Sequence, residues 1–274
     1  AGYQRVMLVF GGVAMVLLFA TFLFCKERVA PMAPQQTNVI EDLKVLLKTR
    51  AWSCLAAGGL LAFSVLLLPV TNAVYYMTYV AQRPDHIPVY LVLSGGSMML
   101  AAIVSGVLTK FFCKRTVWRA GSLGAVILLA SLYFVDPQNL ATVYLLTVLA
   151  NLCIGVTIPI NFAMASDVAD LIELEHGRRM PGLVFSGLAF AGKAGLGLGG
   201  ALAGMLLAIF GYVPNVAQTP LAIDGIKMCM SLIPAVGCLA LLAVQMLYPL
   251  DRAGLGALSE ALGRKRAESN LLPA

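Results

Sequence analysis

One charged side chain, Lys193, stands near the middle of an apolar stretch that is otherwise rich in glycine. The stretch runs from Gly182 to Phe210 (GLVFSGLAFAGKAGLGLGGALAGMLLAIF), and it exceeds the ~20 apolar residues that a helix needs to cross a bilayer. At about 1.5 Å per residue, Lys193 lies about 16 Å from Gly182, which is deep for a lysine that must reach the membrane surface. Because ionisable groups at such depth are costly, we predict a functional site at Lys193. The alternative is a lysine that pairs with a carboxylate and only stabilises packing.

The helical period places Lys193 on a face with small residues. This face consists of Phe190, Lys193, Gly197, Gly200 and Gly204. Glycines on a helix face allow a second backbone to approach closely, as in small-xxx-small packing. We therefore expect Lys193 to point into a helix bundle or a wet cavity rather than into lipid, and we assign it to substrate binding.

A second group of chemically capable residues is acidic and is followed by two arginines. The carboxylates recur every third residue, at Asp167, Asp170 and Glu173, and the arginines are Arg178 and Arg179. This spacing makes one acidic stripe if the segment is helical. We predict a charge-paired latch between helix ends that acts as a cytoplasmic gate. A carboxylate metal site and a merely solvated loop are the alternatives, and we assign no metal site.

A basic turn offers further partners for these carboxylates. It carries Lys110, Lys114 and Arg115 just after an apolar stretch. We expect Asp167 and Asp170 to pair with this turn or with the two arginines. The tendency of cytoplasmic loops to be basic would explain the same charges without any pairing.

Polar side chains also occur inside other apolar stretches, at Asn72, Tyr75, Tyr76, Thr78, Thr157 and Asn161. Amides, hydroxyls and aromatic faces are suited to binding a sugar. We select Asn161 and Tyr76, with Lys193, as candidate substrate-binding residues. The alternative for any single one is a hydrogen bond between helices. We find no GxxxxGK[ST], HExxH or GxSxG pattern, so we predict that the chain is not an enzyme.

The composition is that of a polytopic membrane protein. Hydrophobic residues make up 60% of the chain and charged residues 12%, with a mean hydropathy of +0.88, whereas soluble domains have about 25% charged residues. The net charge of +6 does not indicate nucleic-acid binding, because the basic residues lie in short loops between apolar stretches. The six cysteines form no CxxC pair, which argues against a zinc site or a disulfide framework.

Hydropathy predicts seven membrane spans, at Arg5–Cys25, Ala51–Val80, Val89–Thr109, Val117–Val135, Leu140–Met164, Gly182–Phe210 and Ile223–Leu250. The chain then divides into a first span at 1–25, a linker at 26–50, a six-helix bundle at 51–250 and a tail at 251–274 that we expect to be partly disordered. In the linker, Asn38 is a candidate N-cap, and Ile40, Leu43 and Leu47 form the apolar stripe of an amphipathic helix.

The distribution of Lys and Arg predicts the orientation. One alternate set of loops carries most of the basic residues, while the opposite set holds only Arg5, Arg83 and Lys227. We therefore expect the basic loops and the C-terminus to be cytoplasmic and the N-terminus to be outside. Because the chain begins with Ala1 and enters a span almost at once, we expect it to be a fragment or a processed product.

A longer pattern carries a resemblance to a known family. It comprises Ala163-Met-Ala-Ser-Asp-Val-Ala-Asp-Leu-Ile-Glu173, Gly177-Arg-Arg179, Gly182, Phe190-Ala-Gly-Lys-Ala-Gly195, Gly199-Gly-Ala201, Gly211-Tyr212, Gln218-Thr219, Gly225-Ile226 and Tyr248-Pro-Leu250. In order and spacing it resembles the glycoside-pentoside-hexuronide:cation symporters, the melibiose permease family of the major facilitator superfamily. The resemblance extends from about Gln4 to Leu250. The family pattern has a tyrosine where this chain has Leu171.

The resemblance implies an all-α membrane protein whose seven spans correspond to helices 6–12 of the major facilitator fold. It implies sugar:cation symport by alternating access in the plasma (inner) membrane. The partners would be the lipid bilayer, a small sugar and the N-terminal six-helix half of the same transporter. It implies no cofactor, and a coupling cation (Na⁺ or H⁺) bound mainly by that N-terminal half. The alternatives are a non-transporting scaffold or regulatory half-protein, and a facilitator for a non-sugar amphiphile.

Overall fold

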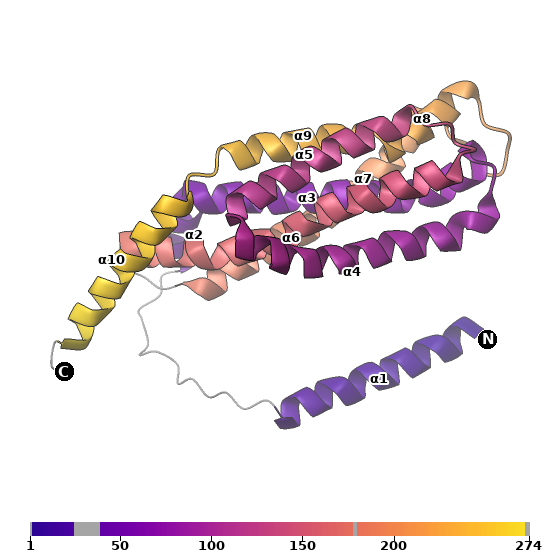
Figure 1. The fold of residues 1–274 in the computed structure, drawn as a ribbon. Helices are drawn as coiled ribbons and strands as arrows, with labels where there is room; N and C mark the ends of the chain where they lie inside the picture. Colours follow the sequence, from indigo (N-terminus) through magenta and orange to yellow (C-terminus); the bar gives the residue numbers. More distant parts are fainter. Residues whose placement is uncertain (1, 25–38, 178–179, 272–274) are drawn as a thin grey trace. The chain divides into compact units, whose positions relative to one another are not determined.

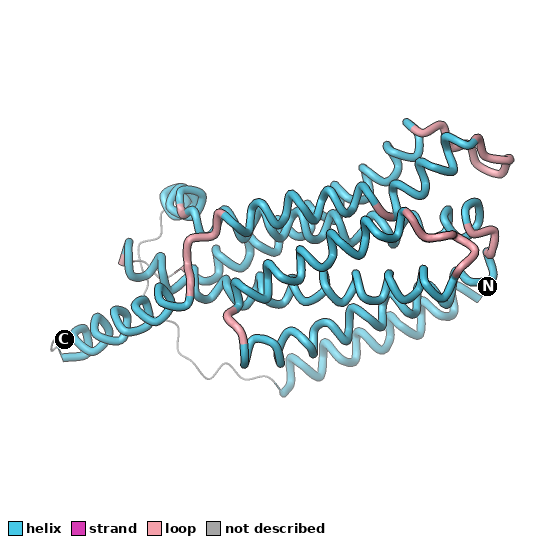
Figure 2. The backbone as a smooth tube through the Cα atoms, turned by 45° about the horizontal axis from the view of Figure 1, so that its top comes forward, coloured by secondary structure: helices cyan, strands magenta, loops and turns pink. Residues whose placement is uncertain are grey.

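The computed structural model describes residues 2–24, 39–177 and 180–271, and every regular element in these ranges is a helix (Figures 1 and 2). Seven helical segments of the described chain are long and apolar enough to cross a membrane, which confirms the predicted number of spans. The chain forms two compact units, residues 1–39 and 40–274. The first unit contains α1 (Gly2–Phe24), whose one charged residue is Arg5. A helix that is apolar on all sides is typical of a membrane span.

The second unit is a bundle of long helices with shorter ones at its ends (Figure 1). In chain order its elements are α2 (Val39–Lys48), α3 (Arg50–Tyr75), the π-helical turn η1 (Tyr76–Val80), the 3₁₀ turn η2 (Pro84–His86), α4 (Ile87–Phe111), α5 (Lys114–Tyr133), α6 (Leu140–His176), α7 (Pro181–Ile209), α8 (Pro220–Met230), α9 (Leu232–Met246) and α10 (Arg252–Leu271). Helix α3 packs against α7, α9 and α6, while α6 also packs against α4 and α5. These contacts make α3 and α6 the centre of the bundle.

Small and polar residues join the helices of this bundle. The Asn151 amide of α6 donates a hydrogen bond to the Ser94 hydroxyl of α4 at 2.9 Å, and the Trp52 indole of α3 donates to the Val184 carbonyl of α7 at 3.3 Å. In a bilayer, lipid is as apolar as a helix surface, so such bonds and close backbone packing hold helices together. This explains polar side chains that are nearly as buried as the apolar core.

Helix α6 is longer than the span predicted from hydropathy. The prediction ended at Met164, whereas the helix continues to His176. Gly177 ends it with a left-handed backbone (φ 65°), a conformation that glycine adopts without strain. The acidic residues after Met164 are therefore helical, as the acidic stripe requires.

The last predicted span is not one continuous helix. The sequence predicts Ile223–Leu250, but the chain breaks at Ser231 (φ −130°, ψ −79°) between α8 and α9. Pro234 explains the break because its nitrogen has no hydrogen for the carbonyl four residues earlier, and its ring crowds that turn. The Ser231 hydroxyl donates to the Lys227 carbonyl at 2.6 Å, which uses a backbone acceptor near the break.

The C-terminal segment is also different from the prediction. Residues 252–271 form α10, so the expectation of partial disorder is wrong for this range. The Asp251 carboxylate accepts a hydrogen bond from the Gly254 amide at 2.8 Å at the start of the helix. Leu258 and Leu262 are buried, which holds an otherwise polar helix against the bundle.

The linker contains the predicted amphipathic helix as α2. Leu46 is fully buried, whereas Ile40, Leu43 and Leu47 are exposed. The apolar stripe therefore faces away from the bundle, and a different leucine anchors the helix. The candidate N-cap Asn38 lies outside the described residues.

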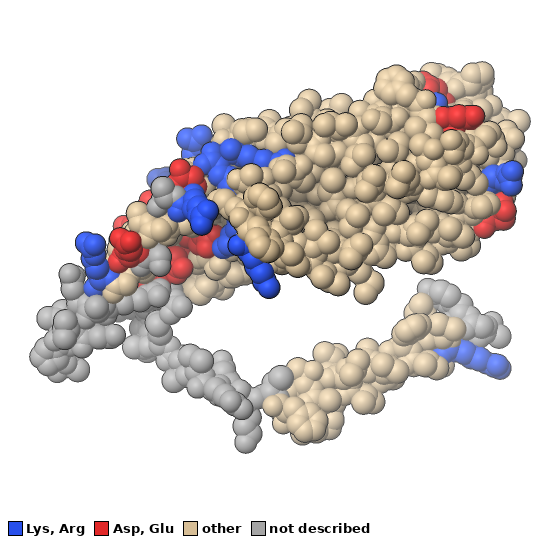
Figure 3. Space-filling view, in the orientation of Figure 1, with Lys and Arg blue, Asp and Glu red and all other residues tan. Residues whose placement is uncertain are grey.

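Charged residues of the second unit gather at the two ends of the bundle, and a belt without charge separates them on the face seen in Figure 3. We call one end the basic end; it contains Lys44, Lys48, Arg50, Lys110, Lys114, Arg115, Arg119 and Arg252. The opposite end has the basic residues Arg83 and Lys227. A belt without charge between charged ends is the arrangement of a membrane-spanning bundle.

Candidate substrate face and charged latch

One face of α7 packs closely against α3. A Cβ atom at Gly192 would meet the Phe63 ring at 2.9 Å, and one at Gly199 would meet the Ser64 carbonyl oxygen at 2.7 Å. At Gly195 it would collide with the backbone of Leu60. The Ser64 hydroxyl donates to the Gly195 carbonyl at 2.9 Å across this contact. Glycine is needed here because the two backbones approach too closely for a side chain.

The opposite face of α7 carries Lys193 and is mostly uncovered; only at its edge would a Cβ atom, built at Gly200, meet the Leu67 side chain of α3 at 3.6 Å. Phe190 is 75% exposed, Lys193 is exposed, and nothing lies within 4 Å of a Cβ atom built at Gly197 or Gly204. The prediction that this glycine face meets a backbone is therefore wrong within this unit, where the close contact uses the other glycines. Lys193 lies on the outside of the bundle and makes no hydrogen bond or ion pair with a described residue.

The depth of Lys193 agrees with the prediction. It lies 12 residues after Pro181 and 16 residues before Ile209, the two ends of α7. At about 1.5 Å per residue, these separations are about 18 and 24 Å. Its ammonium group is therefore attached near the middle of a span, where an ionisable side chain calls for a polar partner.

Asn161 lies inside the bundle, next to a recess between α3, α6 and α7. Its side chain is 4% exposed, and its amide donates to the Leu55 carbonyl at 3.0 Å. The recess is lined by Gly59, Ala62, Phe63, Ile158, Asn161, Phe162 and Leu188. Phe63 also contacts Gly192, the residue before Lys193. Phe63 therefore touches both the recess beside Asn161 and the residue before Lys193, while Asn161 itself serves as a helix–helix contact.

Tyr76 does not join these residues. It belongs to a separate buried cluster with Met77, Tyr90 and Ile226, and it is 1% exposed. Tyr76 lies 17 residues beyond Gly59, at the start of η1, which directly continues α3, so it is about 25 Å further along. Its hydroxyl has no hydrogen-bond partner among the described residues. The three predicted substrate-binding residues thus do not form one site.

A charged latch joins α5 to α6 at the basic end. The Lys114 ammonium lies 2.8 Å and 3.0 Å from the two carboxylate oxygens of Asp167, and it also donates to the Ala163 carbonyl at 3.2 Å. The side chains are 31% and 18% exposed. This pair confirms the predicted partnership of Asp167 with the basic turn. Arg178 and Arg179 lie outside the described residues, so their part in the gate stays a prediction.

The sequence matches a family model described as MFS/sugar transport protein over residues 1–252. The chain belongs to this family. It is 31% identical over 268 residues to YagG of Escherichia coli, provisionally named a glycoside/cation symporter, with 97% of the chain and 58% of YagG covered. It is also 31% identical over 276 residues to the inner membrane symporter YicJ of E. coli, covering 97% of the chain and 59% of YicJ.

A third relative is the isoprimeverose transporter of Lactiplantibacillus pentosus, 28% identical over 278 residues, with 99% of the chain and 57% of the relative covered. The chain thus spans less than three fifths of the length of these relatives. Membership of the MFS/sugar transport family makes it a multi-pass membrane protein of a transporter family and not an enzyme. It also confirms the family inferred from the Ala163–Leu250 pattern.

Two polar contacts of this family member were not recognised from its sequence. Arg119 of α5 donates to the Gln245 carbonyl at the end of α9 at 3.0 Å and 3.2 Å, and the Gln245 amide donates to the Ser122 hydroxyl at 2.7 Å. Arg119 lies within a predicted span, and a charged residue there could have indicated such a polar contact. A third contact joins His86 to Tyr144, whose hydroxyl lies 2.8 Å from the His86 ring nitrogen Nδ1.

Proposed function

We propose that this chain is the C-terminal part of a sugar:cation symporter that works by alternating access, with its seven spans corresponding to helices 6–12 of the full fold. Its family and the names of its relatives support a sugar as substrate. Secondary transporters of this kind bind substrate near the middle of the bilayer, between two helical bundles. The observation that carries the proposal is Lys193, which is exposed near the middle of α7 and pairs with none of the described residues.

The uncovered face of α7 has the chemistry for a sugar. The Lys193 ammonium offers three hydrogen-bond donors for hydroxyl groups, and the exposed Phe190 ring offers an apolar surface. An N-terminal six-helix half would cover this face and supply the carboxylates that bind the coupling cation, Na⁺ or H⁺. In this arrangement Asn161 supports the recess behind Lys193, and Tyr76 stabilises the bundle instead of touching the sugar.

The test is the change of Lys193 to Ala in the transporter that contains this chain. We expect sugar affinity to fall at least about tenfold, equivalent to about 1.4 kcal/mol. The melting temperature in detergent should stay unchanged, because Lys193 makes no hydrogen bond or ion pair with the described residues of the bundle. Lys193→Arg should retain part of the affinity, since it keeps the charge but changes the donor geometry.

The control for this test is Lys110→Ala, which removes an exposed lysine at the end of α4. It should leave both quantities unchanged. A Lys193→Ala protein with normal sugar affinity and a lowered melting temperature would show that the lysine is structural, and it would remove the proposed site.

We also propose that the basic end faces the cytoplasm of a cell whose plasma membrane holds the protein. The excess of Lys and Arg at one end supports this orientation. In a variant without native cysteines, a cysteine at exposed Gln138 should react with an impermeant maleimide added outside the cell, and one at exposed Thr116 should not. The reverse labelling would contradict both the orientation and the assignment of the spans to helices 6–12.

A further inference from the structure

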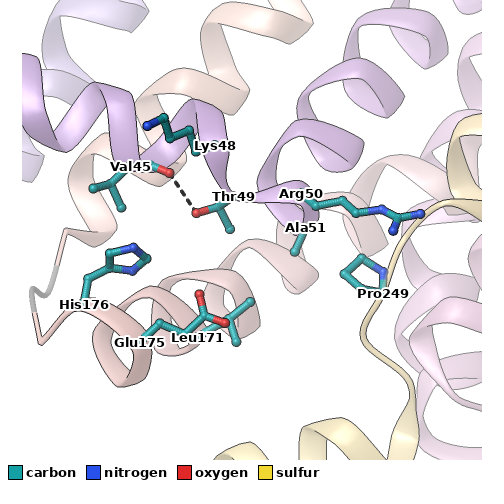
Figure 4. A pocket seen from close by; sticks show the side chains of 9 residues that line it. All are labelled: Val45, Lys48, Thr49, Arg50, Ala51, Leu171, Glu175, His176 and Pro249. Atoms are coloured by element: carbon teal, nitrogen blue, oxygen red, sulfur yellow. Dashed lines mark hydrogen bonds between the residues drawn. The ribbon is translucent and has the colours of Figure 1, made fainter.

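A hollow at the basic end lies between the linker helix and the end of α6. It has a volume of about 230 Å³ and is lined by Val45, Lys48, Thr49, Arg50, Ala51, Leu171, Glu175, His176 and Pro249 (Figure 4). A second hollow adjoins it through Val45, Lys48 and His176. Pockets for drug-sized ligands are about 300–1,000 Å³, so the first hollow suits a smaller group.

The charged groups around this hollow do not satisfy one another. Lys48, Arg50, Glu175 and His176 make no side-chain hydrogen bond or ion pair with any described residue. Figure 4 shows Glu175 and His176 on the α6 side, Lys48 at the α2 rim and Arg50 reaching toward Pro249. Opposite charges that share a hollow without pairing provide separate places for a negative and a positive group.

The first turn of α3 adds donors to the positive part. Thr49 is its N-cap but makes no capping hydrogen bond; its hydroxyl turns back to α2 and donates to the Val45 carbonyl at 2.9 Å. The amides of Arg50 and Ala51 therefore begin the helix without a side-chain acceptor. Amides at a helix start favour an anion, and here two cationic side chains accompany them.

The hollow lies where a lipid headgroup would be. Helix α2 borders it and exposes Ile40, Leu43 and Leu47, the apolar stripe of a helix that lies in a membrane surface. Lys48 and Arg50 mark the boundary where the charged end meets the long apolar helix α3. Acyl chains beside such a stripe would bring a phosphate to the level of these two residues.

We propose that this hollow binds the headgroup of a zwitterionic phospholipid that carries a primary amine, as phosphatidylethanolamine does. Arg50, Lys48 and the first amides of α3 bind the phosphate, and Glu175 binds the ammonium group. A headgroup with a negative charge alone leaves Glu175 without a partner. A trimethylammonium group has no N–H to donate to that carboxylate. The site therefore discriminates among lipids by the amine, and it does not depend on transport of a sugar.

The test is lipid binding by the purified chain in detergent, measured by native mass spectrometry. The probes are dioleoyl phosphatidylethanolamine, phosphatidylglycerol and phosphatidylcholine, and soluble phosphoethanolamine and inorganic phosphate. We expect phosphatidylethanolamine to bind about fivefold or more tightly than the other two lipids. Glu175→Gln should remove that preference and leave phosphatidylglycerol binding equal or stronger. Arg50→Gln and Lys48→Gln should each weaken binding of all three lipids.

Two controls separate this site from general attraction to a charged surface. Lys110→Gln, at the same end but outside the hollow, should leave the binding of all three lipids unchanged. Lys227→Gln, at the other end, should also leave it unchanged. Equal binding of the three lipids by the native chain, or a preference that survives Glu175→Gln, would overturn the proposal. Binding of soluble phosphoethanolamine or phosphate as tight as that of the lipid would show a free phosphate site and would equally overturn it.

Discussion

The two faces of α7 carry similar residues but have opposite surroundings. Gly192, Gly195 and Gly199 meet the rings and backbone of α3, whereas Gly197 and Gly204 meet nothing within 4 Å. The first face is satisfied inside the bundle, and the second holds an exposed lysine. The residues that pack this helix against α3 and the residues that could bind a ligand therefore lie on different faces. A substitution on one face should leave the contacts of the other face unchanged.

The largest effect that would test this separation is expected at Gly195. In Gly195→Ala the new methyl group would collide with the Leu60 backbone, which cannot move aside as a flexible side chain would. Overpacking of this kind costs about 1–3 kcal/mol, and we expect the upper part of that range. The melting temperature of the chain in detergent, followed by tryptophan fluorescence, should fall clearly.

Gly197→Ala is the matched control on the opposite face. Its methyl group meets nothing within 4 Å, and alanine favours a helix by up to about 1 kcal/mol relative to glycine. The melting temperature should therefore stay the same or rise. If both variants were destabilised equally, the two faces would not differ as described.

The sequence predicted which residues share a face of α7 but not which face meets the bundle. The helical period links Lys193 to Gly197 and Gly204, yet glycines occur on both faces of this helix. Which face of α7 packs against α3 depends on where α3 has small residues or exposed backbone. The position of those residues relative to α7 is set by the fold. A glycine pattern alone therefore led to the wrong packing face within this unit, while Lys193 does lie near the middle of its helix.

Burial of polar residues was equally hard to predict inside a membrane. Tyr76 and Asn161 lie in stretches that are apolar on every side, since lipid and protein contacts both select apolar residues. Hydropathy alone was enough to predict the number of spans, and the distribution of Lys and Arg along the chain was enough to predict which loops are basic. The break at Ser231 depends on a local competition around Pro234, which the length of the apolar stretch conceals.

Lys114 and Lys193 also differ in whether a carboxylate of the chain lies beside them. Lys114 has a carboxylate at 2.8 Å within the chain, and Lys193 has no partner among the described residues. A sequence can show that Lys114 and Asp167 are available to each other, but they are 53 residues apart. The packing of α5 against α6 brings them together, whereas no described residue pairs with Lys193.

The smallest effect is expected when the charged latch is broken by Lys114→Gln in the full-length transporter proposed for this chain. Because water reaches both side chains, the free energy of unfolding should fall by only about 1 kcal/mol or less. Transport should nevertheless slow, since the pair biases the balance between inward-open and outward-open states when it forms in one of them. Asp167→Asn should have the same effect, and the double variant should be no worse than either single one, because both changes remove the same interaction.

The measurements are the uptake rate and the chemical unfolding of the same three variants. Unchanged uptake in all three would show that the pair has no gating role. A loss of sugar affinity like that expected for Lys193→Ala would show that the two lysines do not differ as their surroundings indicate.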